Sequence, residues 1–103
     1  MIPIRFKDGV KLQGMRPEVI FASSITMLVC ASLGFPWTMT SGIEGRHSHT
    51  SLHYSGCAFD LRTRDVPDPK LLADSIRESL TSDFDVILER THIHIEYQPR
   101  QIT

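Results

Sequence analysis

Apolar residues recur along the chain with two spacings, one typical of helices and one typical of strands. Over residues 17–32 and 69–81 they return every three or four positions, which predicts two helices. Short runs that mix β-branched, aromatic and apolar residues predict strands at 35–40, 57–62, 84–88 and 92–97. This order of elements predicts an α+β domain with a small, mostly antiparallel sheet and two helices packed on it.

The first predicted helix has signals at both ends. Pro17 suits the first helical turn, where its missing N–H costs nothing, and Gly34 is a typical stop just beyond the last turn. The second predicted helix has Asp68 as its N-cap, followed by Pro69. The residues expected on the buried face of the first helix are Phe21, Ile25, Leu28 and Val29.

The N-terminus contains a turn signal. Asp8-Gly9 is a favoured two-residue hairpin turn, and it lies between the short runs 4–7 and 10–12. We therefore expect a small N-terminal β-hairpin ahead of the first helix.

Length and charge limit the possible functions. With 103 residues, the chain forms one small domain, 1–103. Eleven basic residues against twelve acidic ones argue against a mainly electrostatic nucleic-acid binder. Two cysteines, Cys30 and Cys57, are too few for a disulfide-rich scaffold and exclude a four-thiolate zinc site. We expect a monomer or a weak homo-oligomer.

No residue between positions 19 and 43 is charged, which raises the question of a membrane span. Gly34 and Pro36 interrupt the run, and its apolar part ends near Leu33, short of the roughly 20 residues that a span needs. We expect a buried helix followed by a buried strand. The N-terminus has no long apolar stretch behind a basic start, so we expect no signal peptide and a chain that is cytoplasmic as synthesised.

The five histidines form two short clusters. His47, His49 and His53 make one cluster, and His92 and His94 make the other. Neutral imidazoles and carboxylates are zinc ligands, and catalytic zinc usually has three protein ligands and one open position. On a strand, the two histidines at 92 and 94 point to one face, while Ile93 and Ile95 point to the core on the other.

Asp60 is the acidic residue that completes the pattern. His53 and Asp60 are seven positions apart, too far along one straight strand or one helix for both to bind one ion. The chain must therefore turn between them, and Ser55-Gly56 supplies the turn. Ala58, two positions before Asp60, is expected to share its face.

These residues also resemble a known group of proteins. Residues 51–61, SLHYSGCAFDL, resemble the S-x-H-x-x-G-x-A-x-D-[LI] motif of the zinc D-alanyl-D-alanine peptidases. Residues 92–94, HIH, are similar to the second motif of the wider group, which includes lysostaphin-type endopeptidases and the hedgehog signalling domain. Residues 45–54 resemble the hedgehog version in particular. The resemblance covers about a third of the chain and implies a hedgehog/DD-peptidase-like fold.

The resemblance implies a bound Zn²⁺ held by His53, Asp60 and His94. In an alternative alignment His92 is the third ligand, because Glu89-x-x-His92 matches the carboxypeptidase pattern. Glu89 is the first candidate for the general base in either case, and His92 is the second.

Further residues acquire roles only through the resemblance. Arg46 would bind the substrate carbonyl or the developing oxyanion, and His47, Ser51 and Tyr54 would contact substrate in the cleft. The expected activity is zinc-dependent hydrolysis of a peptide bond in bacterial peptidoglycan peptides, involving a D-amino acid. A non-catalytic zinc-containing binding module and a zinc-stabilised structural subunit remain alternatives.

Overall fold

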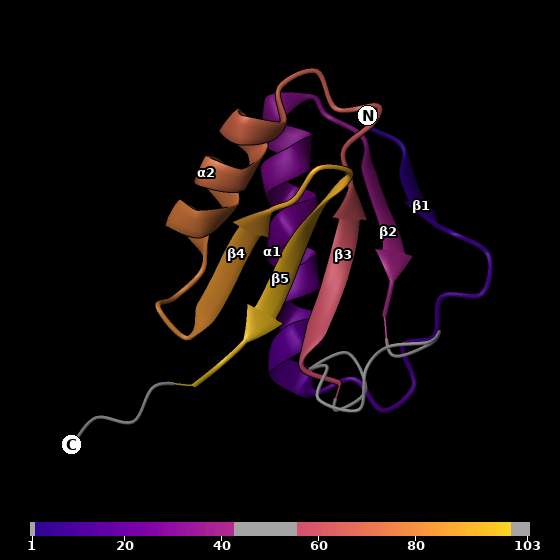
Figure 1. The fold of residues 1–103 in the computed structure, drawn as a ribbon, viewed down its shortest axis with the longest axis vertical. Coiled ribbons are helices and arrows are strands. Elements are labelled where there is room, and N and C mark those ends of the chain that lie inside the picture. Colours follow the sequence, from indigo (N-terminus) through magenta and orange to yellow (C-terminus); the bar gives the residue numbers. More distant parts are fainter. Residues whose placement is uncertain (1, 43–55, 100–103) are drawn as a thin grey trace.

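The computed structural model describes residues 2–42 and 56–99, which form one five-stranded sheet and two helices (Figure 1). In chain order the elements are β1 (Ile4–Phe6), α1 (Pro17–Leu33), β2 (Trp37–Ser41), β3 (Ala58–Arg62), α2 (Pro69–Ser79), β4 (Phe84–Leu88) and β5 (His92–Tyr97). The strand order across the sheet is β1-β2-β3-β5-β4. The predicted α+β class with two helices is confirmed. The sheet is mixed, because β1 and β2 are parallel while the other pairs are antiparallel.

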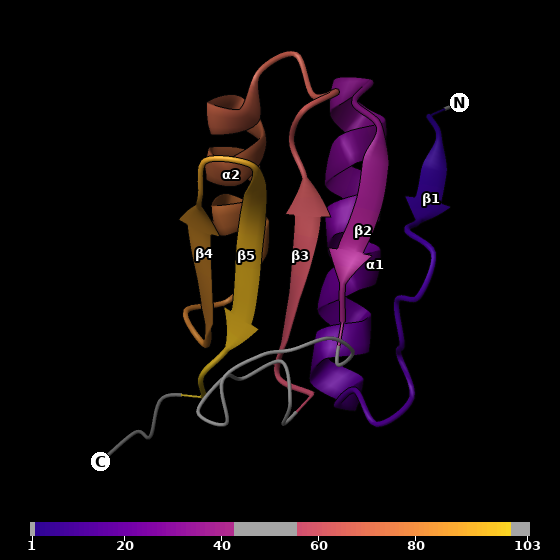
Figure 2. The same ribbon diagram turned by 45° about the vertical axis from the view of Figure 1, so that its right-hand side comes forward.

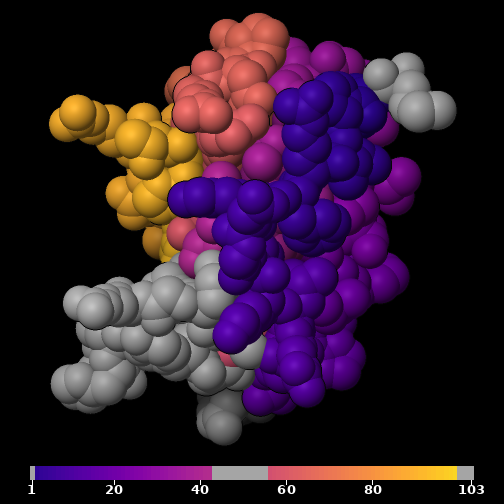
Figure 3. All heavy atoms as spheres, turned by 90° about the vertical axis from the view of Figure 1, so that its right-hand side faces the viewer, coloured from indigo at the N-terminus to yellow at the C-terminus, as the bar shows by residue number. Residues whose placement is uncertain are grey.

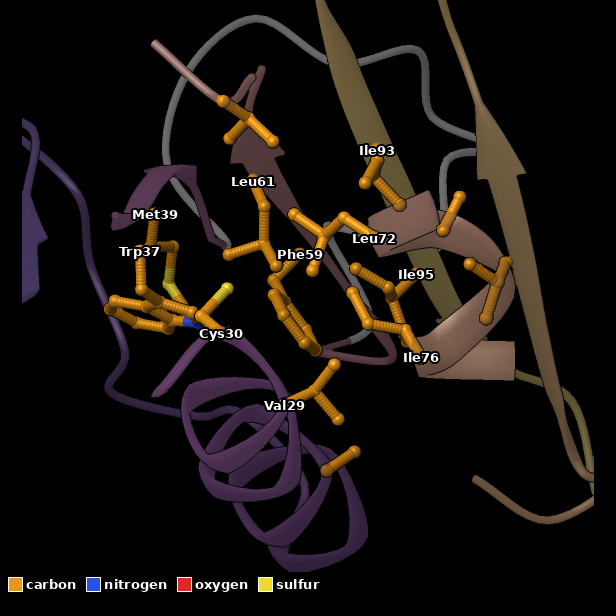
Figure 4. Packing of buried hydrophobic residues seen from close by; sticks show 14 of the residues in the cluster. Val29, Cys30, Trp37, Met39, Phe59, Leu61, Leu72, Ile76, Ile93 and Ile95 are labelled. Carbon is orange, nitrogen blue, oxygen red and sulfur yellow. The ribbon is translucent and has the colours of Figure 1, made fainter. Parts of the chain in front are cut away.

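Both helices cover the same face of the sheet, which lies behind the strands in Figure 1 and Figure 2. Alternate residues of the central strands point into this layer, and Figure 4 shows how they pack. The largest of these side chains, each at most 1 % exposed, are Trp37, Met39, Phe59, Leu61, Ile93 and Ile95. The predicted core positions of Ile93 and Ile95 are confirmed. We call this side the covered face and the opposite side the open face.

The predicted buried face of α1 is wrong at two of its four positions. Phe21 and Leu28 are 69 % and 67 % exposed, whereas Val29 is buried. The buried face consists mainly of small residues, namely Val19, Ala22, Ser23, Thr26, Val29 and Cys30. Apolar residues surround this helix on nearly every side, so their spacing does not reveal which side packs.

Hydrogen bonds of the Thr26 hydroxyl allow polar side chains on this buried face. Thr26 Oγ1 donates to the Ser23 carbonyl at 2.7 Å and accepts from Trp37 Nε1 at 2.9 Å. The indole N–H and the threonine hydroxyl are therefore both satisfied inside the core, where an unpaired polar group is costly. Gly34 ends the helix in the left-handed region at φ 74°, as predicted.

The predicted N-terminal hairpin is wrong. Asp8 and Gly9 do form a turn, but residues 10–12 are not a strand, and β1 instead pairs in parallel with β2. Phe6 packs edge-on against Trp37, with ring centroids 5.2 Å apart. The contact with the buried Trp37 thus accompanies the parallel pairing of β1 with β2, and α1 connects these two strands. Figure 3 shows the N-terminal residues, in indigo, lying along this side of the molecule.

The second helix is close to its prediction. The Asp68 side chain accepts from the Leu71 amide at 3.0 Å, and Pro69 begins the helix. The helix ends at Ser79, two residues before the predicted end, because Leu80 is already extended. The bounds of β4 and β5 agree with the prediction. Within the described ranges, no helix is long and apolar enough to cross a membrane.

The start of β3 is held against the start of α1. Gly56 has φ +75°, and a Cβ there would lie 2.4 Å from the Gly14 carbonyl oxygen. The Gly56 carbonyl accepts from the Arg16 amide at 3.0 Å. This close backbone contact requires a glycine and sets the position from which β3 carries Asp60 into the sheet.

Candidate functional site

The polar residues of β3 and β5 gather on the open face. Because side chains alternate along a strand, the burial of Ile93 and Ile95 on the covered face turns His92, His94 and Glu96 to the other side. In the antiparallel register Asp60 pairs with His94, so these two side chains leave neighbouring strands at the same level. The prediction that the two histidines share a face is confirmed.

Asp60, His94 and Glu96 form a connected row. His94 Nδ1 lies 2.8 Å from Asp60 Oδ1, and His94 Nε2 lies 2.9 Å from Glu96 Oε1. The side chains of all three are 14–18 % exposed. The amide of Gln98 donates to the second oxygen of Glu96. Both ring nitrogens of His94 are therefore held by carboxylates, which fixes the orientation of the ring.

The two carboxylates also change the acid–base behaviour of His94. The hydrogen bond with Asp60 raises the pKa of the imidazole, burial opposes this, and the charges of Asp60 and Glu96 add to the increase. A positively charged imidazolium between two carboxylates is the state that this geometry stabilises in the absence of a metal ion.

His92 lies at the margin of this row. Its Nε2 is 3.9 Å from Asp60 Oδ2, beyond hydrogen-bond distance, and its Nδ1 lies 3.1 Å from the Thr91 hydroxyl. His94 is thus the histidine in direct contact with Asp60. The Nε2 atom of His92 can contact a ligand that binds over Asp60 on the open face.

The donor set of this row suits a zinc ion in part. Asp60 offers a carboxylate oxygen and His94 offers Nδ1, while Glu96 on Nε2 is the carboxylate contact that commonly orients a zinc-bound histidine. Two donors of a tetrahedral zinc lie about 3.3 Å apart, so this pair would open by roughly half an ångström. Within residues 2–42 and 56–99, no three His, Cys, Asp or Glu side chains are grouped to hold a metal ion.

The remaining ligand and several other predicted site residues lie outside the described residues. They are Arg46, His47, Ser51, His53 and Tyr54. Of the first motif, the structure describes the part from Gly56 onwards. Ala58, fully buried, precedes Asp60 by two positions on the same strand and so shares its side of the sheet, as predicted.

Glu89, the first candidate for the general base, lies in the turn between β4 and β5. Its amide donates to the His92 carbonyl at 2.8 Å, which places Glu89 across the hairpin from His92. The side chain is exposed, and no cation of the described ranges pairs with it. It lies two residues along the β4–β5 ladder from the pairing of Ile87 with His94, on the side of β5 away from Asp60.

Glu96 is the residue of this row that sequence reasoning did not assign. The signal was present, because positions 92, 94 and 96 share one face of a strand. Its contact with Nε2 of His94 depends on side-chain geometry, which spacing alone does not give.

No protein-family model matches the chain, and a search of curated proteins returns no match.

Proposed function

We propose that this protein is a zinc-dependent peptidase that hydrolyses a peptide bond next to a D-amino acid in bacterial cell-wall peptides. The observation that carries the proposal is the direct contact of Asp60 with His94, at 2.8 Å, with Glu96 on the other ring nitrogen. The substrate class rests on the resemblance of residues 51–61 and 92–94 to the D-alanyl-D-alanine peptidases and their relatives.

In this proposal His53, Asp60 and His94 hold the zinc ion. Zinc supplies Lewis-acid activation of a water molecule and of the scissile carbonyl. The register supports His94 over His92 as the third ligand, since His94 faces Asp60 directly while His92 is 3.9 Å away from it. Glu96 keeps the His94 ring turned toward Asp60 and acts as a positioning residue.

Glu89 and His92 are the proposed proton carriers. A general base takes the proton of the attacking water and delivers it to the leaving amine. Glu89 lies across the β4–β5 hairpin from His92, and His92 lies two residues before His94 on the same face of β5. Arg46 is proposed to bind the substrate carbonyl, and His47, Ser51 and Tyr54 to contact the peptide. The wall would be reached after release or export.

Metal content tests the site. We expect about one zinc per chain in the wild type by elemental analysis, and its loss in Asp60→Ala, since a missing ligand commonly costs most of the affinity. Asp74→Ala on α2 is the matched control, because Asp74 is a carboxylate on the opposite side of the sheet. Folded wild type without zinc after dialysis against zinc would overturn the proposal.

Hydrolysis of wall peptides tests the chemistry. Glu89→Gln is expected to keep zinc and lower kcat by about 10²–10⁴, the usual contribution of a general base. Glu78→Gln on α2 removes the same charge far from the site and should leave kcat unchanged. Equal kcat in Glu89→Gln and wild type would transfer the role of the base to His92.

One observation favours a second candidate, a zinc-stabilised binding or structural module. His92 Nε2 lies 3.9 Å from Asp60 Oδ2, close enough for His92 to become a fourth ligand and close the site. In that case His92→Ala lowers the zinc affinity and the wild type hydrolyses no wall peptide. In the peptidase, His92→Ala leaves the zinc content unchanged.

A further inference from the structure

A second feature of the open face is a cavity of about 420 Å³ at the end of the sheet where β3 ends and β5 begins. Four cationic side chains line it: Lys7, Arg62, Arg64 and Arg90. They come from three separate parts of the chain, namely the residue after β1, the end of β3 with the residues that follow, and the β4–β5 turn. The proposed peptidase site does not use them.

Backbone hydrogen bonds hold these segments together. The Lys7 amide donates to the Met39 carbonyl at 2.9 Å, which fixes Lys7 beside β2. The Thr63 amide donates to the Thr91 carbonyl at 3.3 Å, which joins the end of β3 to the β4–β5 turn. The cationic side chains are therefore brought together by the fold itself.

The positive charge of this cavity is only partly compensated. Arg62 Nη2 binds Asp65 at 3.0 Å. Asp65 also interacts electrostatically with Arg64. Among residues 2–42 and 56–99, no carboxylate lies within ion-pair distance of Lys7, Arg64 or Arg90. Gathering like charges in one concave place is unfavourable and attracts an anion from solution.

Arg62 carries a more specific signal. Its Nε is buried and has no hydrogen-bond partner among the described residues, although its Nη2 is paired. A buried donor without a partner is costly, so a ligand that accepts from Nε would be stabilised there. The side chain of Arg62 as a whole is 21 % exposed, and Nε lies in its buried part, so a ligand in the cavity accepts from Nε only after a small turn of the guanidinium group.

We propose that this cavity binds a small phosphomonoester. A phosphate group offers several acceptor oxygens, which suit guanidinium N–H groups and the hydroxyls of Thr63 and Thr91 on the same wall. The volume lies within the range of small-molecule sites and exceeds what one phosphate fills, which leaves room for the ester group. His92 also lines the cavity, whereas Asp60 and His94 do not, so the two sites meet at His92.

The test is a titration followed by NMR of the amide signals of Thr63, Arg64, Arg90 and Thr91. Glycerol phosphate, inorganic phosphate and acetate are added separately to zinc-free protein in EDTA at constant ionic strength. Chelation prevents phosphate on a bound zinc from being counted. We expect saturable shifts at these amides, with glycerol phosphate tighter than inorganic phosphate and acetate at least tenfold weaker.

Two double variants of equal charge change locate the site. Arg64→Gln/Arg90→Gln removes two exposed cations from the cavity, and binding of glycerol phosphate should weaken about tenfold or more. Lys70→Gln/Arg77→Gln removes two cations from α2 and should leave it unchanged. Arg62→Lys, which keeps the charge but removes Nε, is expected to weaken phosphate binding as well.

The proposal is overturned if the wild type shows no saturable shifts, if acetate binds as well as glycerol phosphate, or if both double variants bind like the wild type. Because the titration is made without zinc, its outcome is independent of the metal content and of peptidase activity. Failure of one proposal therefore leaves the other standing.

Discussion

The two faces of the sheet are built from the same strands yet differ in almost every physical property. On β5, Ile93 and Ile95 are fully buried under the helices, while His92, His94 and Glu96 stand between them on the open face. The covered face consists of close-packed apolar side chains (Figure 4). The open face carries carboxylates, imidazoles and guanidinium groups.

The comparison separates stability from chemistry. Apolar burial contributes most of the free energy of folding, so substitutions on the covered face should unfold the protein. The charged groups of the polar row on the open face pair with one another at 14–18 % exposure, so the net contribution of each pair to stability is smaller than that of the apolar core.

The largest expected difference in the free energy of unfolding is between a substitution on the covered face and one on the open face. Ile93→Ala removes a fully buried side chain and should lower the free energy of unfolding by about 2–5 kcal/mol. Ile87→Ala, at a position 41 % exposed on β4 opposite His94, should cost about 1 kcal/mol or less. Urea denaturation measures both. Equal costs would mean that the open face is covered as well.

An intermediate effect is expected where a polar contact lies within the covered face. Thr26→Val keeps the shape of the side chain but leaves Trp37 Nε1 without its partner, which should cost about 1–3 kcal/mol. Ser24→Ala on the exposed side of the same helix is the control and should change the stability by less than about 0.5 kcal/mol. If Thr26→Val is neutral, the indole N–H has found another acceptor.

The smallest effect concerns the pH dependence of the open face. The raised pKa of His94 means that the folded zinc-free protein binds this proton more tightly than the unfolded chain. The stabilisation, about 1 kcal/mol for a partly exposed pair, is complete below the ordinary histidine pKa and is lost as the pH rises through the folded value.

Urea unfolding in EDTA at a series of pH values from 5 to 9 measures this dependence, and His94→Asn should flatten it above about pH 6. Zinc affinity should change in the opposite direction and weaken toward acid pH, because the proton on His94 must leave before the ring binds metal. An unchanged pH profile in His94→Asn would show that another group is responsible.

The two helices show how far prediction from the sequence extends. For α2, the Asp68 cap, Pro69 and a one-sided apolar pattern agree, so its start and its packing side follow from local chemistry. For α1, apolar residues occur all round, and its ends were predictable while its buried face was not. The packing of small residues and the hydrogen bond between Thr26 and Trp37 determine which side of α1 faces the sheet.

The sequence by itself determined the α+β class, the start of α2, the bounds of β4 and β5, and the shared face of His92 and His94. These features depend on caps and on periodicity, which act over a few residues.

Only the tertiary structure decided the parallel β1–β2 pairing, the contact of Asp60 with His94 and Glu96, and the cavity of Lys7, Arg62, Arg64 and Arg90. Each depends on strand register or on segments far apart in the chain. Such contacts are set by the packing of the whole core, to which local pattern contributes only a part.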